Sequence, residues 1–412
     1  MKPMVASLYV TVKCNFRCTY CDDGSGTIYP ELPEPGRMDT EQTLRVIELM
    51  REASPGFNIT GGEPTLRPDI DLLYDRVGEL GFMPVTFNTN AFLLDRHLRI
   101  LRNIDYLVVS LDAIDQARSD ALIDTGKGGQ SRRVLDNLAL AADFKREQRL
   151  AFETIINTVI LPETIEDAWD VWELCLARGW FWSPMPHIVG KYPNPGLVDN
   201  PAWLELVDEV IRAKKKGALI YGGLPALRAI RDFSRYECYP TTRPVIYPNG
   251  DLMYPCAPLQ TVAANLLEAG SYEKALQVFR RRAPSIRRPA RRRPGCAARS
   301  QPARRAPFAA PSRAAAAAQR GKAGARLHLA PLAQAPARRA PRPRQPGDGL
   351  RQDPPREDPR VTAGAIRGAP SRGQAGRERE RPLSRGIDKP CAGWPRAGWL
   401  THLGAWVSID GS

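Results

Sequence analysis

The sequence predicts an α/β protein built on a parallel sheet that closes toward a barrel. Short β-branched or apolar runs alternate with longer segments of helical period along the first half of the 412-residue chain, which is the pattern of repeated βα units. We predict six strands, at Ala6–Val12, Gly56–Thr60, Pro84–Asn88, Tyr106–Leu111, Ala151–Val159 and Trp180–Pro184. Helices are predicted between them at Asp39–Ala53, Pro68–Leu80, Asp95–Arg102, Ser131–Arg146 and Ile165–Arg178, with Thr40 and Ser131 as caps.

A different organisation begins after the sixth strand. The proline-rich stretch KYPNPG is followed by two segments of helical period, Ala202–Lys216 and Pro225–Ser234. Pro244–Pro255 then reads as a hairpin, because two apolar runs flank the turn signal PNGD. We therefore predict a small module that begins near Cys238 and follows the parallel sheet.

Charge divides the chain into two unlike parts. Residues 1–279 carry 29 basic and 37 acidic side chains, a net charge of −8, whereas residues 280–412 carry 30 and 8, a net charge of +22. The formal charge of +14 for the whole chain averages these parts. It therefore does not indicate a nucleic-acid-binding surface on the folded part, and we do not expect nucleic acid as a partner.

Residues 280–412 consist mainly of Arg, Ala, Pro and Gly. Low apolar content and high charge do not offset the entropy lost on ordering, so we predict a disordered segment. One interpretation is an arginine-rich arm that binds phosphates. We favour the other, a shifted reading frame in GC-rich DNA, because the helical segment Tyr272–Phe279 runs into the Arg-rich text without a stop signal. On that interpretation the segment carries no native activity.

Cysteine usage and hydropathy indicate a cytoplasmic protein. No apolar run approaches the roughly 20 residues that cross a bilayer, and the chain enters a strand-like pattern directly, so neither a signal peptide nor a membrane partner is expected. Three of the eight cysteines fall in the segment KCNFRCTYC. Such a cluster is typical of metal ligands in a reducing compartment rather than of a secreted disulfide framework.

Cys14, Cys18 and Cys21 are spaced C-x3-C-x2-C directly after the first predicted strand. Thiolates are soft ligands suited to iron–sulfur clusters, and three of them can hold three irons of a cubane while the fourth stays open. A zinc site would normally need a fourth protein ligand. The four histidines, at positions 97, 187, 328 and 402, are all remote from this loop. A structural zinc site remains the alternative.

A second motif, Asn58-Ile-Thr-Gly-Gly-Glu-Pro64, follows the second predicted strand. With the cysteine spacing and Tyr20 before the last cysteine, it resembles the radical S-adenosylmethionine (radical SAM) superfamily. The resemblance implies a partial (β/α)6 TIM-type barrel over residues 1–216, with a [4Fe–4S] cluster at its mouth. It implies an enzyme that reductively cleaves S-adenosylmethionine to a 5′-deoxyadenosyl radical, which abstracts hydrogen from a peptide or small-molecule substrate. Flavodoxin or ferredoxin is the kind of electron donor it implies.

The same resemblance assigns cofactor contacts to strand ends. Gly61 and Gly62 permit close backbone approach, and the carboxylate of Glu63, beside Pro64, can accept hydrogen bonds from the methionine ammonium. The further cofactor-binding candidates are Tyr20, Asn88, Thr89, Ser110 and Asn157, with Asn90 and Asp112 as neighbours in the same motifs. Each of these polar residues could instead cap a helix or turn for local reasons.

Cys238 and Cys256 bracket the predicted hairpin and resemble the opening of a SPASM or twitch auxiliary-cluster domain, which we place at residues 217–279 as a truncated module. Only Cys296 and Cys391 follow, so any auxiliary iron–sulfur cluster would be incomplete. Two ordinary buried cysteines are the alternative, and Cys175 is expected in the core. His187 and Lys191, after the sixth strand, are candidates for substrate-facing catalytic residues.

Two further classes of function compete with the enzyme. A non-catalytic iron–sulfur or zinc protein could act as a sensor or scaffold, but it would not release 5′-deoxyadenosine under reduction. A nucleic-acid-binding protein acting through its basic tail would keep its affinity in residues 280–412 alone, and ranks last.

Overall fold

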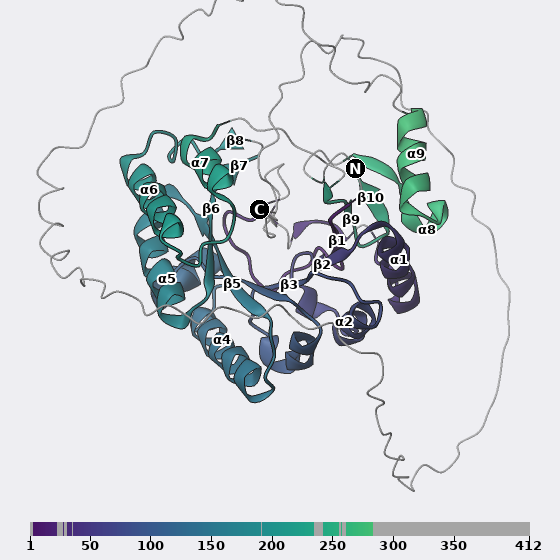
Figure 1. Ribbon diagram of the computed structural model, residues 1–412, viewed down its shortest axis with the longest axis horizontal. Coiled ribbons are helices and arrows are strands. Elements are labelled where there is room, and N and C mark those ends of the chain that lie inside the picture. The colour runs from purple at the N-terminus through teal and green to yellow at the C-terminus, as the bar shows by residue number, and fades with distance from the viewer. Residues whose placement is uncertain are drawn as a thin grey trace, which may run out of the picture. The chain divides into compact units, whose positions relative to one another are not determined.

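A nine-stranded sheet forms the centre of the fold, in the order β11-β10-β9-β1-β2-β3-β4-β5-β6. Strands β1 to β6 are parallel neighbours in chain order. They span Val5–Tyr9, Gly56–Thr60, Val85–Thr89, Tyr106–Ser110, Glu153–Ile160 and Phe181–Pro186. The predicted α/β class with six parallel strands is confirmed, and Figure 1 shows these strands in a curved arrangement with helices on the outer side.

The computed structural model describes residues 3–22, 28, 31–34, 36–190, 192–234, 242–254, 257 and 261–282. Lys191, Cys238, Cys256 and residues 283–412 lie outside this part. The candidate role of Lys191, the auxiliary cluster and the predicted disorder of the tail therefore stay predictions. Within the described residues, no helix is both long and apolar enough to cross a membrane.

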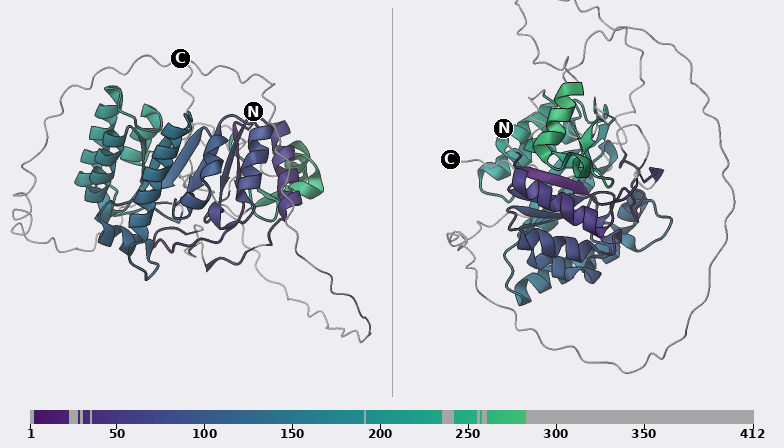
Figure 2. Two further views of the ribbon diagram at one scale, coloured as in Figure 1. Left: turned by 90° about the horizontal axis from the view of Figure 1, so that it is seen from below. Right: turned by 90° about the vertical axis from the view of Figure 1, so that its right-hand side faces the viewer.

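Nine α-helices occur in the described part of the chain. They are α1 (Thr40–Ala53), α2 (Ile70–Glu79), α3 (Gln116–Ile123), α4 (Gln130–Glu147), α5 (Ile165–Arg178), α6 (Pro201–Lys215), α7 (Leu224–Asp232), α8 (Leu266–Ala269) and α9 (Tyr272–Arg282). Short 3-10 helices span Pro64–Leu66, Leu94–Arg96, Leu98–Arg102 and Pro162–Thr164, and β7 (Ile188–Val189) pairs with β8 (Tyr192–Pro193). Figure 2 shows the helices beside the sheet from two further directions.

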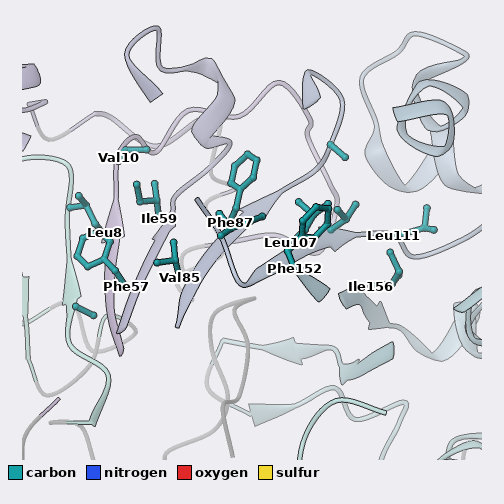
Figure 3. Packing of buried hydrophobic residues seen from close by; sticks show 14 of the residues in the cluster. Leu8, Val10, Phe57, Ile59, Val85, Phe87, Leu107, Leu111, Phe152 and Ile156 are labelled. Atoms are coloured by element: carbon teal, nitrogen blue, oxygen red, sulfur yellow. The ribbon is translucent and has the colours of Figure 1, made fainter. Parts of the chain in front are cut away.

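The two faces of the sheet differ in chemistry because side chains alternate along each strand. Leu8, Phe57, Phe87 and Leu107 belong to the core cluster between the sheet and the helices, as Figure 3 shows. The residues of opposite parity are more polar; they include Ser7, Asn58, Asn88, Ser110 and Asn157. Ser110 pairs in register with Asn157, which pairs with Ser183 on β6. One face of the sheet thus packs the core and the other carries polar groups.

Three local predictions were wrong. The predicted helix Asp95–Arg102 is two 3-10 helices, because His97 between them leaves the helical region with φ −129°. Thr40 is the first helical residue and not the cap: Asp39 accepts from the Gln42 N–H at 2.8 Å and forms a capping box. At α4 the cap position is Gly129 rather than Ser131, and Asp120 from α3 accepts the Gly129 and Ser131 N–H groups at 2.6 and 2.9 Å.

The predicted hairpin exists as β9 (Val245–Ile246) and β10 (Asp251–Met253), which are antiparallel. Its turn is closed by the Gly250 N–H, which donates to the Tyr247 carbonyl at 2.9 Å, and Gly250 has φ +88°. Strand β9 pairs in parallel with β1. The hairpin therefore continues the main sheet, while the division of the chain between residues 216 and 217 stays a prediction.

A buried arginine joins the starts of α1 and α2. The Arg67 side chain is 3% exposed and its Nε donates to Asp69 at 2.6 Å, while its Nη2 donates to Thr43 Oγ1 at 2.9 Å. Thr40 Oγ1 also donates to Asp69, at 2.7 Å. Burial alone would raise the pKa of Asp69, but the hydrogen bonds from Arg67 and Thr40 outweigh it and lower the pKa.

The ion pair of Arg67 with Asp69 should make the free energy of unfolding depend on pH. Because the pKa of Asp69 is lowered on folding, its contribution is present above the unfolded pKa of about 3.9 and is lost as the pH falls below it. We expect Asp69→Asn to lower the free energy of unfolding at pH 7 by about 1–3 kcal/mol. Urea titrations between pH 7 and pH 3 should show the wild type and the variant converging at the acid end. A constant difference across this range would contradict the assignment.

Candidate active site

The three motif cysteines lie in the loop after β1 and line one pocket. The loop is tied to the end of α3, since the Arg17 N–H donates to the Ile123 carbonyl at 2.9 Å. It also turns on itself, with the Cys21 N–H donating to the Cys18 carbonyl at 3.1 Å. Cys14, Cys18 and Cys21 are not in disulfides. Three thiols thus surround a common space.

Burial sets the acidity of these thiols. It raises the pKa of Cys14 to about 12, with a smaller contribution from the charge of Glu63, and it also raises the pKa of Cys21 to about 12. It raises the pKa of Cys18 well above its ordinary value. Thiols in such surroundings ionise when they bind metal cations. Among the described residues, no group of three or more His, Cys, Asp or Glu side chains is placed to hold one metal ion. Thiols spread around a pocket suit a multi-iron cluster, where each binds a different iron.

The glycines of the second motif lie directly against the cysteine loop. The Gly62 N–H donates to the Thr11 carbonyl at 2.9 Å, and the Glu63 N–H donates to the Lys13 carbonyl at 2.8 Å. A Cβ on Gly61 would lie 2.2 Å from the Thr11 oxygen, and one on Gly62 would lie 2.2 Å from the Lys13 oxygen. Gly61 also has φ +140°. Only glycine permits this approach of the two backbones.

We therefore expect Gly62→Ala to push the cysteine loop away from the second motif. The loss of free energy of unfolding should be about 2 kcal/mol, together with a lower iron content after reconstitution. Gly128→Ala is the matched control, because a Cβ there meets nothing within 4 Å. Thermal unfolding and iron analysis of both variants test this expectation, and equal behaviour of the two would contradict it.

Glu63 is a buried carboxylate that follows β2 and contacts the carboxyl end of β3. It is 1% exposed. Its Oε1 accepts from the Thr65 N–H at 3.0 Å, from Thr65 Oγ1 at 2.7 Å and from Thr89 Oγ1 at 2.9 Å. Its Oε2 accepts only the Asn90 N–H among the described residues, at 2.7 Å. Burial raises the pKa of Glu63 despite these bonds. Oε2 therefore retains capacity to accept a further donor from a ligand.

Two amide side chains on the polar face of the sheet have buried atoms without a partner. Asn88 Nδ2 donates to Asn58 Oδ1 at 2.8 Å, which leaves Asn88 Oδ1 unpaired among the described residues. On β5, Asn157 Nδ2 is likewise unpaired within the described part. Both residues line the pocket with the cysteines. Buried polar atoms of this kind are suited to bonds with a ligand.

Tyr20 connects the cysteine loop to the ends of β4 and β5. Its hydroxyl donates to Asp112 Oδ2, and Asp112 Oδ1 accepts the Val159 N–H at 2.7 Å. Burial raises the pKa of Asp112 to about 6, against the lowering effect of the bond from Tyr20. Because Tyr20 lies between two of the cysteines, this chain of bonds fixes the loop on the sheet.

His187 lies beside the pocket rather than in its lining. Its ring is 6.3 Å from that of Tyr20 between centroids, and its Nδ1 is 2.9 Å from Asn194 Nδ2. Burial lowers the pKa of His187, although the charges of Asp22 and Glu163 act in the other direction. A catalytic role for His187 stays a prediction. Cys175 is buried in the core, as expected.

One pocket contains every residue that the sequence assigns to the main cluster or its cofactor. These are Cys14, Cys18, Tyr20, Cys21, Gly61, Gly62, Glu63, Pro64, Asn88, Thr89, Ser110 and Asn157. The structure adds Phe16 from the cysteine loop and Ser119, Ile123, Ser131 and Val134 from α3 and α4. The helical residues carry no motif that would identify them in the sequence. The three cysteines fit an iron–sulfur cluster, and the unpaired amides with the buried Glu63 carboxylate fit a small polar cofactor.

Fold and site thus define an α/β protein with a cysteine-lined pocket beside the ends of parallel strands. Residues 8–175 match the model of the Radical SAM superfamily, so this part of the chain is a radical SAM domain. That superfamily uses a [4Fe–4S] cluster and S-adenosylmethionine, as the resemblance implied.

The chain is also similar to several enzymes whose names are known. The GTP 3′,8-cyclase of Staphylococcus saprophyticus is 35% identical over 166 residues, which cover 39% of this chain and 46% of the cyclase. The S-adenosylmethionine-dependent nucleotide dehydratase of Flammeovirga pacifica is 27% identical over 183 residues, which cover 40% of this chain and 61% of the dehydratase. The chain spans about half the length of the cyclases it matches.

The fold is also similar to that of Streptococcus suis SuiB bound to S-adenosylmethionine. The TM-score is 0.51, with 20% sequence identity, and the match covers 65% of this chain and 64% of SuiB. At this identity the likeness concerns the fold alone.

Proposed function

We propose that this protein is a radical SAM enzyme that binds a [4Fe–4S] cluster on Cys14, Cys18 and Cys21 and cleaves S-adenosylmethionine reductively. The observation that carries the proposal is the joining of two motifs: the cysteine loop and the Gly61–Gly62 segment are hydrogen-bonded along their backbones at 2.9 and 2.8 Å and line one pocket. When bound, the cluster supplies the electron that cleaves the cofactor to methionine and a 5′-deoxyadenosyl radical.

The side chains of the pocket divide the work of holding the cofactor. Glu63 Oε2 accepts the methionine ammonium, because it is a buried carboxylate oxygen with remaining capacity. The paired glycines let the second motif pack directly against the cysteine loop, because a Cβ on either would lie 2.2 Å from a backbone oxygen of Thr11 or Lys13. The further candidates are Tyr20, Pro64, Asn88, Thr89, Ser110 and Asn157, all from the same pocket. Their common task is to orient the cofactor and exclude water from the reacting centre.

For the substrate we propose a small metabolite, with nucleotides as the first class to test. The cyclase and dehydratase relatives are named for GTP and nucleotides. A peptide is the alternative class of substrate. We further propose flavodoxin or ferredoxin as electron donor, and a cytoplasmic location, since clustered free cysteines are typical of metal ligands in a reducing compartment.

The test is anaerobic reconstitution with iron and sulfide, followed by dithionite and S-adenosylmethionine. We expect about four irons per chain and formation of 5′-deoxyadenosine. The amount of 5′-deoxyadenosine should increase when GTP is added as the first nucleotide to test. Release of 5′-deoxyadenosine separates the enzyme from a non-catalytic iron–sulfur sensor or scaffold. Tight binding of zinc without any cluster would overturn the proposal.

A further inference from the structure

Asn90 follows β3 and lines the pocket without being a cluster ligand. Its backbone N–H donates to Glu63 Oε2 at 2.7 Å. Its side-chain Nδ2 lies 3.8 Å from the Cys14 sulfur, within hydrogen-bonding range of sulfur, and 2.8 Å from Asn15 Oδ1. Asn90 thus touches both the carboxylate proposed for the cofactor and a cysteine proposed for the cluster. Among the described residues its side chain is 8% exposed and therefore shielded from water.

The orientation of this amide is determined by its neighbours. The Phe92 N–H donates to Asn90 Oδ1 at 3.0 Å, so the oxygen faces the backbone and Nδ2 must face the sulfur. The turn is braced from α4, where Asn137 Nδ2 donates to the Ala91 carbonyl at 2.8 Å and the Phe92 carbonyl at 3.1 Å. The donor is therefore held toward Cys14 by contacts that do not involve the cluster.

Asn15 carries a second amide N–H donor beside the Asn90 side chain. Its Oδ1 accepts from Asn90 Nδ2, which fixes its amide in turn. Asn15 Nδ2 is then buried without a partner among the described residues. A buried N–H group without an acceptor costs stability, unless a ligand provides the acceptor. Asn15 directly follows Cys14 but is not among the residues that line the pocket, so it is tied to the site by the bond from Asn90.

Hydrogen bonds to cluster sulfurs control reduction potential. Adding one electron to a [4Fe–4S] cluster increases the negative charge on its sulfurs, and N–H donors stabilise the reduced form more than the oxidised form. The effect is strengthened where water is excluded. Removing such a donor makes the cluster harder to reduce.

We propose that Asn90 is a positioning residue that raises the reduction potential of the cluster and couples it to occupation of the cofactor site through Glu63. The proposal rests on the proposed function, because it requires the cluster on Cys14. The electron comes from an external low-potential one-electron donor, which is oxidised as the cluster is reduced. No proton transfer is involved.

The test compares Asn90→Ala and Asn90→Leu with wild type in reconstituted full-length protein. Reduction is followed by electron paramagnetic resonance at fixed applied potentials, with and without S-adenosylmethionine. We expect the ratio of reduced to oxidised cluster to fall about three- to tenfold in both variants, a tenfold change being about 59 mV for one electron. S-adenosylmethionine should change the reduction potential of the wild-type cluster, and we expect this change to be smaller in the variants.

Asn137→Ala is the matched control, since it removes a brace of the same turn but keeps the Asn90 amide and the Phe92 N–H that orients it. We expect it to lose thermal stability with a smaller change of potential than the Asn90 variants. A merely structural role of Asn90 predicts that all three variants lose thermal stability and that none shifts the potential. If the Asn90 variants do not assemble a cluster, Asn15→Ala takes their place, with a smaller shift in the same direction.

The outcomes separate the two proposals. A wild type that forms no cluster defeats the proposed function. A wild type with a cluster, and Asn90 and Asn15 variants of unchanged potential, defeats only the role of Asn90.

Discussion

Cys18→Ala is expected to abolish both cluster assembly and 5′-deoxyadenosine formation, while Cys175→Ala leaves both intact. Cys18 is the middle one of the three loop cysteines and lines the pocket, so in the proposed enzyme its loss leaves two thiolates for the cluster. Iron content should fall from about four to below about one per chain. Cys175 has the same chemistry but lies 1% exposed in the core, on α5.

Iron and sulfide analysis, the visible absorption spectrum and chromatography of the nucleoside product measure this result. The Cys175 control separates loss of a ligand from loss of a buried thiol, because its replacement affects packing alone. Full iron content in Cys18→Ala would show that the loop does not hold the cluster. Loss of iron in Cys175→Ala as well would show that general destabilisation, rather than ligation, explains both variants.

The sheet could be predicted because its signal is local. Strands β1 to β4 each contain five residues that are almost all buried, and such short apolar or β-branched runs between segments of helical period are visible in the sequence. The cysteine loop and the glycine motif could be predicted for the same reason, since each is a short contiguous pattern. The two motifs meet at the pocket because they follow β1 and β2, which are parallel neighbours in the sheet.

Contacts between distant segments carry no such local signal. The bond from Asn90 to the Cys14 sulfur joins residues 76 positions apart, and nothing in either segment announces it. Helix α3 was missed because its apolar residues do not form a clear stripe; only Ser119 and Ile123 are buried. The burial of Arg67 also contradicts the expectation for a charged side chain, and depends on acceptors from two other segments, the residue after β1 and the start of α1.

Glu63 accepts hydrogen bonds from Thr65, Thr89 and Asn90 inside the pocket. It is the residue whose change should most affect cofactor binding. Glu63→Gln replaces one carboxylate oxygen by an NH₂ group that must face either the Asn90 N–H or the donors of Thr65 and Thr89. It also removes the charge that we propose as the acceptor of the methionine ammonium. Loss of one partner of a buried charged pair costs about 2–5 kcal/mol, so the dissociation constant for S-adenosylmethionine should rise at least about 30-fold.

Calorimetric titration of the reconstituted protein measures this change, with Thr65→Ala as control. That variant removes the hydroxyl donated to Glu63 at 2.7 Å but keeps the carboxylate and the Thr65 backbone donor. We expect it to lower the free energy of unfolding by about 1 kcal/mol while leaving the affinity within a few-fold of wild type. If both variants lost affinity equally, the carboxylate would act by holding the β3 turn and not by binding the cofactor, because only Glu63→Gln removes the charge.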